Sequence, residues 1–162
     1  MQTILEIFYV RIFGDMVRYQ RKQANLSQRG SSPDRVIQSF IREKRQNEAG
    51  KVEEKEFIVH STSWRYARPG KVILTYVAYS DDLEFKKGKS HGVSLKRLRT
   101  ITKTSRPPRS KRALEKQVVS HAMRHIAFLI QTDSESDFKS ALQPETKKVF
   151  EKLWVSLAGK VF

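Results

Sequence analysis

The chain has 162 residues, of which 38% are hydrophobic and 30% charged, and this is enough apolar material to fold around a core. The net charge of +15 and the pI of about 10.2 favour nucleic acid, an anionic membrane or an acidic protein as the partner. The absence of cysteine excludes disulfides, thiolate metal sites and cysteine nucleophiles. It is compatible with a reducing compartment, and we expect a cytoplasmic protein.

The most apolar stretch is residues 1–17, in which Glu6, Arg11 and Asp15 are the only charged residues apart from the chain terminus. It is shorter than the roughly 20 apolar residues of a membrane-spanning helix, and it lacks the marks of a signal peptide. We therefore expect no transmembrane segment. Three interpretations remain: a helix docked on the core, which we prefer, a non-native start ahead of Met16, or a helix that contacts a membrane or a partner.

Residues 18–32 are polar and basic and end in Gly and Ser, a composition typical of a linker. Ser32 and Pro33 then suit the N-cap and the first position of a helix. Apolar residues at helical spacing follow, so a helix is predicted over about 33–48. The expected organisation is an apolar segment, a basic linker and a single globular domain over 33–162.

Two stretches rich in β-branched and aromatic residues, about 56–66 and 72–80, flank a turn that contains a Pro-Gly pair. This pattern predicts a β-hairpin. If Arg68 pairs with Lys71, alternate residues of both strands share one face. In that register the face carries His60, Thr62 and Trp64 from the first strand and Thr75, Val77 and Tyr79 from the second.

The remaining elements are predominantly helical. Residues 93–101 give an ambiguous third strand, and a long helix that we expect to be the centre of the core runs over about 110–131. A short helix over 138–142 and an amphipathic helix over about 144–158 complete the chain. Helices before and after a cluster of strands predict an α+β fold, in which these helices pack on a small antiparallel sheet built on the hairpin.

The motifs that identify enzymes are missing. The sequence has no Gly-rich phosphate loop, Walker motif, GxSxG, HExxH or zinc-finger spacing, and it does not match the signatures of the common RNA-recognition fold. We therefore expect no cofactor, and we lean toward a protein without catalytic activity.

The histidines are the candidates for proton chemistry near neutral pH. His121 and His125 are four residues apart on the predicted long helix and share one side of it, and His60 on the hairpin is a third candidate. We prefer to regard them as half-packed boundary residues without a ligand, so no metal ligand is assigned. The alternatives are a metal site or an acid-base pair, which would make the protein a small hydrolase or a metal-dependent enzyme.

The strongest local signal is the segment 86–114, which holds eleven basic residues and no acid. Gly, Ser, Thr and Pro lie between them and supply further donors for phosphate. The pattern is typical of a flexible strand that follows a nucleic-acid backbone. The candidate nucleic-acid-binding residues are Lys86, Lys87, Lys89, Lys96, Arg97, Arg99, Lys103, Arg106, Arg109, Lys111 and Arg112.

Trp64 and Tyr66 are candidates for stacking on bases, although burial on the hairpin is the interpretation we prefer for them. The sequence as a whole favours an accessory protein that binds RNA or single-stranded nucleic acid through residues 86–114, with duplex DNA as the next polyanion. The alternative is an assembly protein that docks on an acidic protein surface. The oligomeric state is open.

Overall fold

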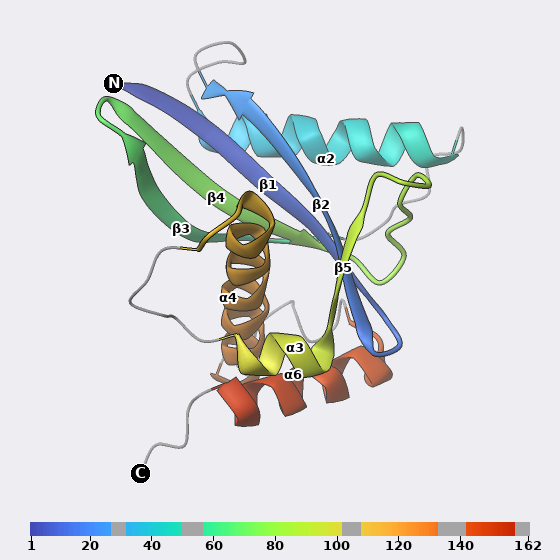
Figure 1. The fold of residues 1–162 in the computed structure, drawn as a ribbon. Coiled ribbons are helices and arrows are strands. Elements are labelled where there is room, and N and C mark those ends of the chain that lie inside the picture. The colour runs from blue at the N-terminus through green and yellow to red at the C-terminus, as the bar shows by residue number, and fades with distance from the viewer. Residues whose placement is uncertain (27–31, 50–56, 102–107, 133–141, 158–162) are drawn as a thin grey trace.

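The computed structural model describes residues 1–26, 32–49, 57–101, 108–132 and 142–157. Its centre is a five-stranded sheet with helices on both faces (Figure 1). The elements are β1 Gln2–Phe13, β2 Met16–Asn25, α2 Pro33–Ala49, β3 Ile58–Arg68, β4 Lys71–Tyr79, β5 His91–Ser94, α3 Leu95–Thr100, α4 Lys111–Thr132 and α6 Pro144–Leu157.

The strands lie in the order β3-β4-β1-β2-β5. β1 runs parallel to β4, and the other three pairings are antiparallel. The α+β class is therefore confirmed, and α2, α4 and α6 occupy the three principal helical segments predicted from the sequence. The sheet is larger than the small antiparallel one expected, and it is mixed, because β1 and β2 join it.

The predictions for residues 1–17 and 18–32 are wrong. In place of a docked helix and a basic linker, residues 2–25 form the hairpin of β1 and β2, with Gly14 at a left-handed φ of 58° as the first residue of the tight turn. Residues 27–31 of the predicted linker lie outside the described residues. β1 is buried on both faces, and such a strand carries an uninterrupted apolar run rather than an alternating one. This is why its sequence resembles a docked helix.

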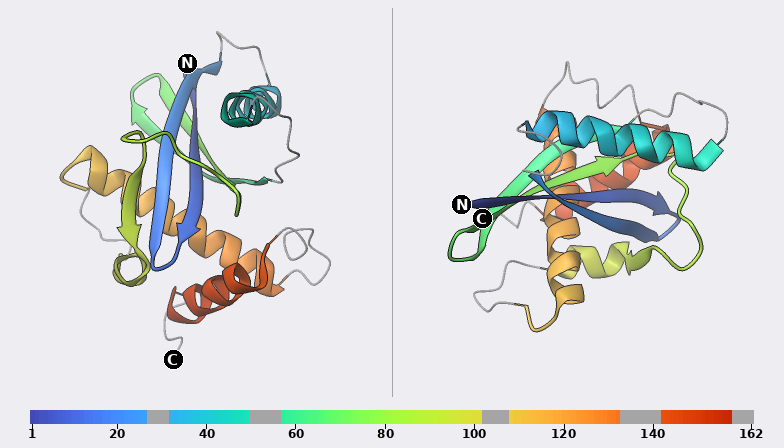
Figure 2. Two further views of the ribbon diagram at one scale, coloured as in Figure 1. Left: turned by 90° about the vertical axis from the view of Figure 1, so that its right-hand side faces the viewer. Right: turned by 90° about the horizontal axis from the view of Figure 1, so that it is seen from above.

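Two cores lie on opposite faces of the sheet. On one face Phe8, Val10 and Tyr19 pack against α4 and α6, and on the other Leu5 and Ile7 pack against α2. Figure 2 shows α4 running across the strands and α2 on the other side of them. The apolar side chains of β1 therefore fill the cores, and the exposed membrane- or partner-binding helix considered for residues 1–17 is wrong. Within the described ranges, no helix combines the length and the apolar character needed to cross a bilayer.

The predicted hairpin is confirmed as β3 and β4, and Arg68 pairs with Lys71. His60 lies opposite Val77 rather than Tyr79, so it keeps the predicted face although its partner differs. However, the register shifts between Tyr66 and Arg68 and again between Ser61 and Ser63, so Trp64 lies opposite Leu74. Because one extra residue reverses the alternation of faces, the predicted placement of Trp64 beside Thr75 and Val77 is wrong.

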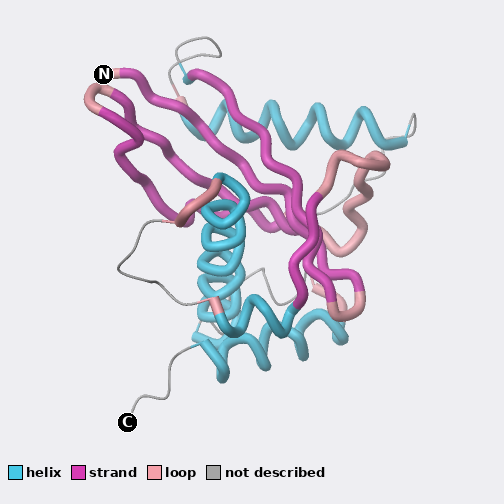
Figure 3. Tube along the Cα trace, viewed as in Figure 1, coloured by secondary structure: helices cyan, strands magenta, loops and turns pink. Residues whose placement is uncertain are grey.

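Residues 93–101, predicted as an ambiguous third strand, form the end of β5 and the helix α3. β5 ends at Ser94 and α3 begins at the next residue, which Figure 3 shows as a direct change from strand to helix. Ser94 is the N-cap, and its Oγ accepts a hydrogen bond of 3.0 Å from the backbone N–H of Arg97. The short helix predicted over 138–142 falls almost entirely outside the described residues.

Candidate nucleic-acid interface

The basic segment 86–114 is largely folded. Lys86, Lys87 and Lys89 lie between β4 and β5, whereas the next three basic residues lie on α3 and Lys111 and Arg112 begin α4. The expectation of a flexible strand is thus wrong for most of the described part of this segment. Its candidates Lys103 and Arg106 lie outside the described residues.

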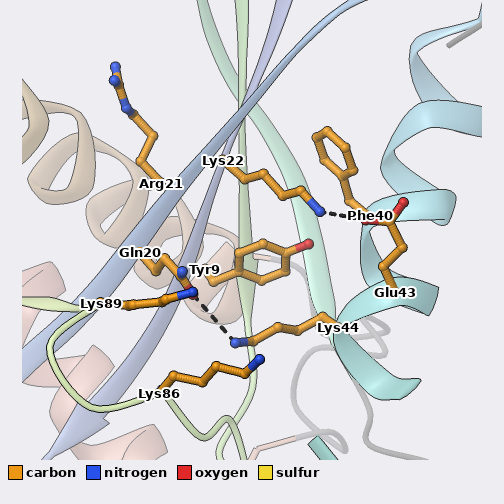
Figure 4. A pocket seen from close by; sticks show the side chains of 9 residues that line it. All are labelled: Tyr9, Gln20, Arg21, Lys22, Phe40, Glu43, Lys44, Lys86 and Lys89. Atoms are coloured by element: carbon orange, nitrogen blue, oxygen red, sulfur yellow. Dashed lines mark hydrogen bonds and ion pairs between the residues drawn. The ribbon is translucent and has the colours of Figure 1, made fainter. Parts of the chain in front are cut away.

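Three hollows lie along β2 and the segment 86–114. The first of them lies between β2, α2 and the turn before β5. It has a volume of about 300 Å³, and Figure 4 shows the residues around it. We call it the lysine hollow, because four lysines from three segments line it. The full lining is Tyr9, Gln20, Arg21, Lys22, Phe40, Glu43, Lys44, Lys86 and Lys89.

Aromatic rings and one carboxylate position two of these lysines. Lys22 Nζ lies 2.5 Å from Glu43 Oε2 and 4.6 Å from the centre of the Phe40 ring. Lys44 Nζ donates a 3.4 Å hydrogen bond to Gln20 Oε1 and lies 5.7 Å from the centre of the Tyr9 ring. Such cation–π contacts hold an ammonium group without neutralising it. The described lining therefore contains four ammonium groups and a single carboxylate.

The central hollow, of about 560 Å³, lies between β2, the turn before β5 and the start of α4. Ser110 caps α4 here, since its Oγ accepts a 3.1 Å hydrogen bond from the N–H of Ala113. Burial first, and the charge of Arg112 second, lower the pKa of His91 at its edge. The hollow is lined by Gln20, Arg21, Gly88, Lys89, His91, Ser110, Lys111, Arg112 and Glu115.

The outer hollow, of about 340 Å³, lies between α3 and the first turns of α4. Arg97 comes from α3, whereas Arg112 and Lys116 come from α4. The remaining lining residues are Thr100, Ile101, Ser110, Ala113 and Gln117. The hydroxyl groups of Thr100 and Ser110 and the amide of Gln117 therefore lie beside the cations of this hollow.

The three hollows adjoin one another. The lysine and central hollows share Gln20, Arg21 and Lys89, and the central and outer hollows share Ser110 and Arg112. Nine cations line this basic row within the described residues, against the carboxylates of Glu43 and Glu115, both of which are ion-paired. The cations are Arg21, Lys22, Lys44, Lys86, Lys89, Arg97, Lys111, Arg112 and Lys116.

Arg21 is held in place by a buried network. Glu6 is fully buried, and its carboxylate accepts hydrogen bonds from Arg21 (3.1 Å), Gln23 (2.6 Å) and Arg65 (3.0 Å). Arg21 Nε also lies 3.5 Å from Glu115 Oε1. Figure 4 shows the Arg21 side chain turned away from the lysine hollow. Arg21 is thus a structural bridge between two carboxylates, and the lysines provide the charge of that hollow.

Five of the predicted binding residues line the row, namely Lys86, Lys89, Arg97, Lys111 and Arg112. Lys87, Lys96, Arg99 and Arg109 are not among its lining residues. Sequence reasoning missed Arg21, Lys22, Lys44 and Lys116. The positive charges of Arg21 and Lys22 are visible in the basic composition of residues 18–32, but that composition favours a linker.

The three candidate histidines lie together. His60 Nε2 is 3.0 Å from His125 Nδ1, and the ring centres of His121 and His125 are 6.0 Å apart. Burial first, and the charge of His125 second, lower the pKa of His60. His60 is on β3, at the opposite end of the strand order from β5, and the three rings are not among the residues lining the row. Across the described ranges, no group of three or more His, Asp or Glu residues is arranged to hold a metal ion.

Trp64 and Tyr66 are exposed, with relative accessibilities of 63% and 68%, so the preferred interpretation of burial is wrong. Their rings meet edge to face with centres 5.4 Å apart. Both residues belong to β3, whereas β2 and β5 lie at the other end of the strand order. The structure therefore does not bring the candidate stacking pair together with the basic row.

The chain matches no model of a known protein family, and no curated protein matches it. The fold and the row define an α+β protein with a continuous set of cationic hollows along β2, the end of α3 and the start of α4.

Proposed function

We propose that the protein binds single-stranded nucleic acid, preferentially RNA, along the basic row, and that it does so without catalysis. The observation that carries the proposal is the continuity of the three hollows, in which nine cations face two carboxylates that are already paired. A nucleic-acid backbone offers a matching series of negative charges, and its binding releases condensed counterions.

The shape of the row supports a single strand rather than a duplex. Reading of duplex DNA relies on a helix or ribbon that projects into the major groove, whereas this surface is recessed. Lys and Arg contact phosphates, and polar side chains such as Gln20, Thr100 and Gln117 offer partners for the 2′-hydroxyls that distinguish RNA from DNA. A cytoplasmic location is part of the proposal and is compatible with the absence of cysteine.

The test compares two triple variants that remove the same charge. Lys89→Gln, Lys111→Gln and Lys116→Gln take cations from the row, whereas the control replaces Lys87, Lys96 and Arg99, which lie outside it, by Gln. Binding of a mixed-sequence RNA strand is measured over a range of salt concentrations. The row variant should flatten the slope of log K against log salt by up to about 2 units, because each contact contributes about −0.7.

The control variant should keep nearly the full slope. Equal loss in both variants would show that diffuse charge, not the row, attracts RNA. No saturable binding of RNA by the wild type at low salt would refute the proposal and favour the acidic protein surface as the partner.

A further inference from the structure

The lysine hollow differs from the two hollows beside it in its chemistry. Its cations, apart from the outward-turned Arg21, are all lysines, and they come from β2, α2 and the turn before β5. In Figure 4 the side chains of Lys44, Lys86 and Lys89 end on the same side of the Tyr9 ring. The other two hollows contain the guanidinium of Arg112 among their cations.

The hollow also lies at one end of the row. It shares lining residues with the central hollow and none with the outer one. The buried rings of Tyr9 and Phe40 form part of its wall. A chain that follows the row therefore meets a strongly cationic compartment with aromatic walls at this end.

The electrostatics of the compartment favour a compact anion of high charge. Glu43 partners Lys22, and the ammonium groups of Lys44, Lys86 and Lys89 line the same hollow. Each ammonium is a compact charge with three donors and needs no planar partner. A terminal phosphate monoester carries about −1.5 to −2 charges and three acceptor oxygens at neutral pH, whereas an internal phosphodiester carries one charge.

We propose that the lysine hollow binds the terminal phosphate monoester of a nucleic-acid strand whose internal phosphates occupy the central and outer hollows. This inference rests on the proposed function and adds that the protein recognises strand ends. A phosphate monoester at the 5′ end and one at the 3′ end have the same chemistry, and the experiment distinguishes the two ends.

The test measures the affinity of the full chain for three RNA strands of one sequence, about 12 nucleotides long to suit a site of this kind. One carries a 5′-phosphate, one a 3′-phosphate, and one has hydroxyls at both ends. One phosphorylated strand should bind about tenfold more tightly than the hydroxyl strand, as expected for added hydrogen bonds between charged groups. The preference should shrink near pH 5, because the monoester takes up a proton with a pKa of about 6 while the lysines keep their charge.

Lys44→Gln and Lys86→Gln should each bring the phosphorylated strand close to the affinity of the hydroxyl strand. Lys116→Gln, in the outer hollow, is the matched control, and it should weaken all three strands by the same factor. Circular dichroism and thermal midpoints verify that each variant is folded, and Lys86 is exposed, so its replacement leaves the core untouched.

Equal affinity of the wild type for the three strands would overturn the recognition of strand ends and leave the proposed function in place. A preference that survives in both lysine variants would also overturn it. Failure of all three strands to bind would overturn the proposed function itself.

Discussion

Glu6 is a fully buried carboxylate whose partners are Arg21, Gln23 and Arg65. Burying a charge is unfavourable unless its partners satisfy it, and removing one member of such a group leaves the others without a countercharge. This network connects the centre of the sheet with Glu115, where the basic row passes the start of α4. A substitution of Glu6 should therefore affect both the stability of the fold and the arrangement of the basic row.

We expect Glu6→Gln to lower the free energy of unfolding by about 3 kcal/mol, because it leaves two guanidinium groups near each other without their shared carboxylate. Glu43→Gln is the comparison, since the pair of Glu43 with Lys22 is more than a third exposed and should contribute less than about 1 kcal/mol. Chemical denaturation measures both. Similar small losses in the two variants would show that the buried network does not stabilise the fold.

The pair of His60 and His125 makes stability depend on pH. The pKa of His60 is lowered in the folded protein, so between that value and the ordinary value of about 6.5 the unfolded chain holds a proton that the folded chain does not. The free energy of unfolding therefore rises with pH across this interval. The contribution is complete above about pH 6.5 and is lost as the pH falls through the folded pKa.

We expect His60→Gln to reduce the rise in unfolding free energy between about pH 5 and pH 7.5. Urea denaturation of wild type and variant at several pH values measures the difference. His91, whose pKa is also lowered, is unchanged in the variant, so the comparison isolates His60. An identical pH profile in both proteins would contradict this assignment.

At the level of elements, β1 determines the architecture because it lies between β2 and β4 and pairs with both. Removing it takes away the strand that joins the two halves of the sheet. It also removes buried side chains from both cores, including Leu5, Ile7, Phe8 and Val10.

A chain that begins at Met16 should therefore lack a cooperative unfolding transition, which is the reverse of what the linker interpretation of residues 18–32 implies. The reason is the loss of several fully buried side chains, each worth about 1.5 to 3 kcal/mol, against a typical total stability of about 5 to 15 kcal/mol. Differential scanning calorimetry provides the measurement. A transition within a few degrees of that of the full chain would restore the linker interpretation.

The elements that sequence predicts well have strong local signals. Ser32 and Pro33 mark the start of α2, helical periodicity marks α4, and the Pro-Gly turn marks the β3–β4 hairpin. β1 was missed because burial on both faces removes the alternation by which strands are recognised, and β2 was missed because most of its residues are polar. The register shifts in β3 have no clear signature in the sequence, and the one between Tyr66 and Arg68 reverses the predicted face of Trp64.

The candidate site was predictable only where its charge is concentrated along the chain. The segment 86–114 supplies five of the lining cations, and its composition reveals them. Lys22 and Lys44 come from β2 and α2, and the tertiary arrangement alone brings them together with that segment, whereas Lys116 follows the segment directly on α4. The meeting of His60 with His125 likewise depends on how α4 crosses the sheet.

For the whole molecule, the net charge of +15 opposes compaction, and a polyanion on the row should relieve part of this repulsion. We expect RNA at about 100 times its Kd to stabilise the protein by about 2.7 kcal/mol. For a chain of this size that corresponds to a rise in Tm of roughly 5 to 10 °C. Thermal melts with and without RNA measure it.

The variant with Lys89, Lys111 and Lys116 replaced by Gln should show a much smaller rise at the same RNA concentration. An equal rise in this variant and the wild type would place the binding site elsewhere on the molecule.

The irregular edge of the sheet bears on whether copies of the protein can pair strand to strand. An exposed edge strand is a template for intermolecular pairing, which leads to aggregation unless bulges or charged side chains disturb it. β3 has register shifts on both sides of the exposed Trp64, and Arg65 and Arg68 place charge along the same strand. Bulges twist and bend a strand locally. The edge is thereby a poor template for fibril growth, although it displays two large aromatic rings.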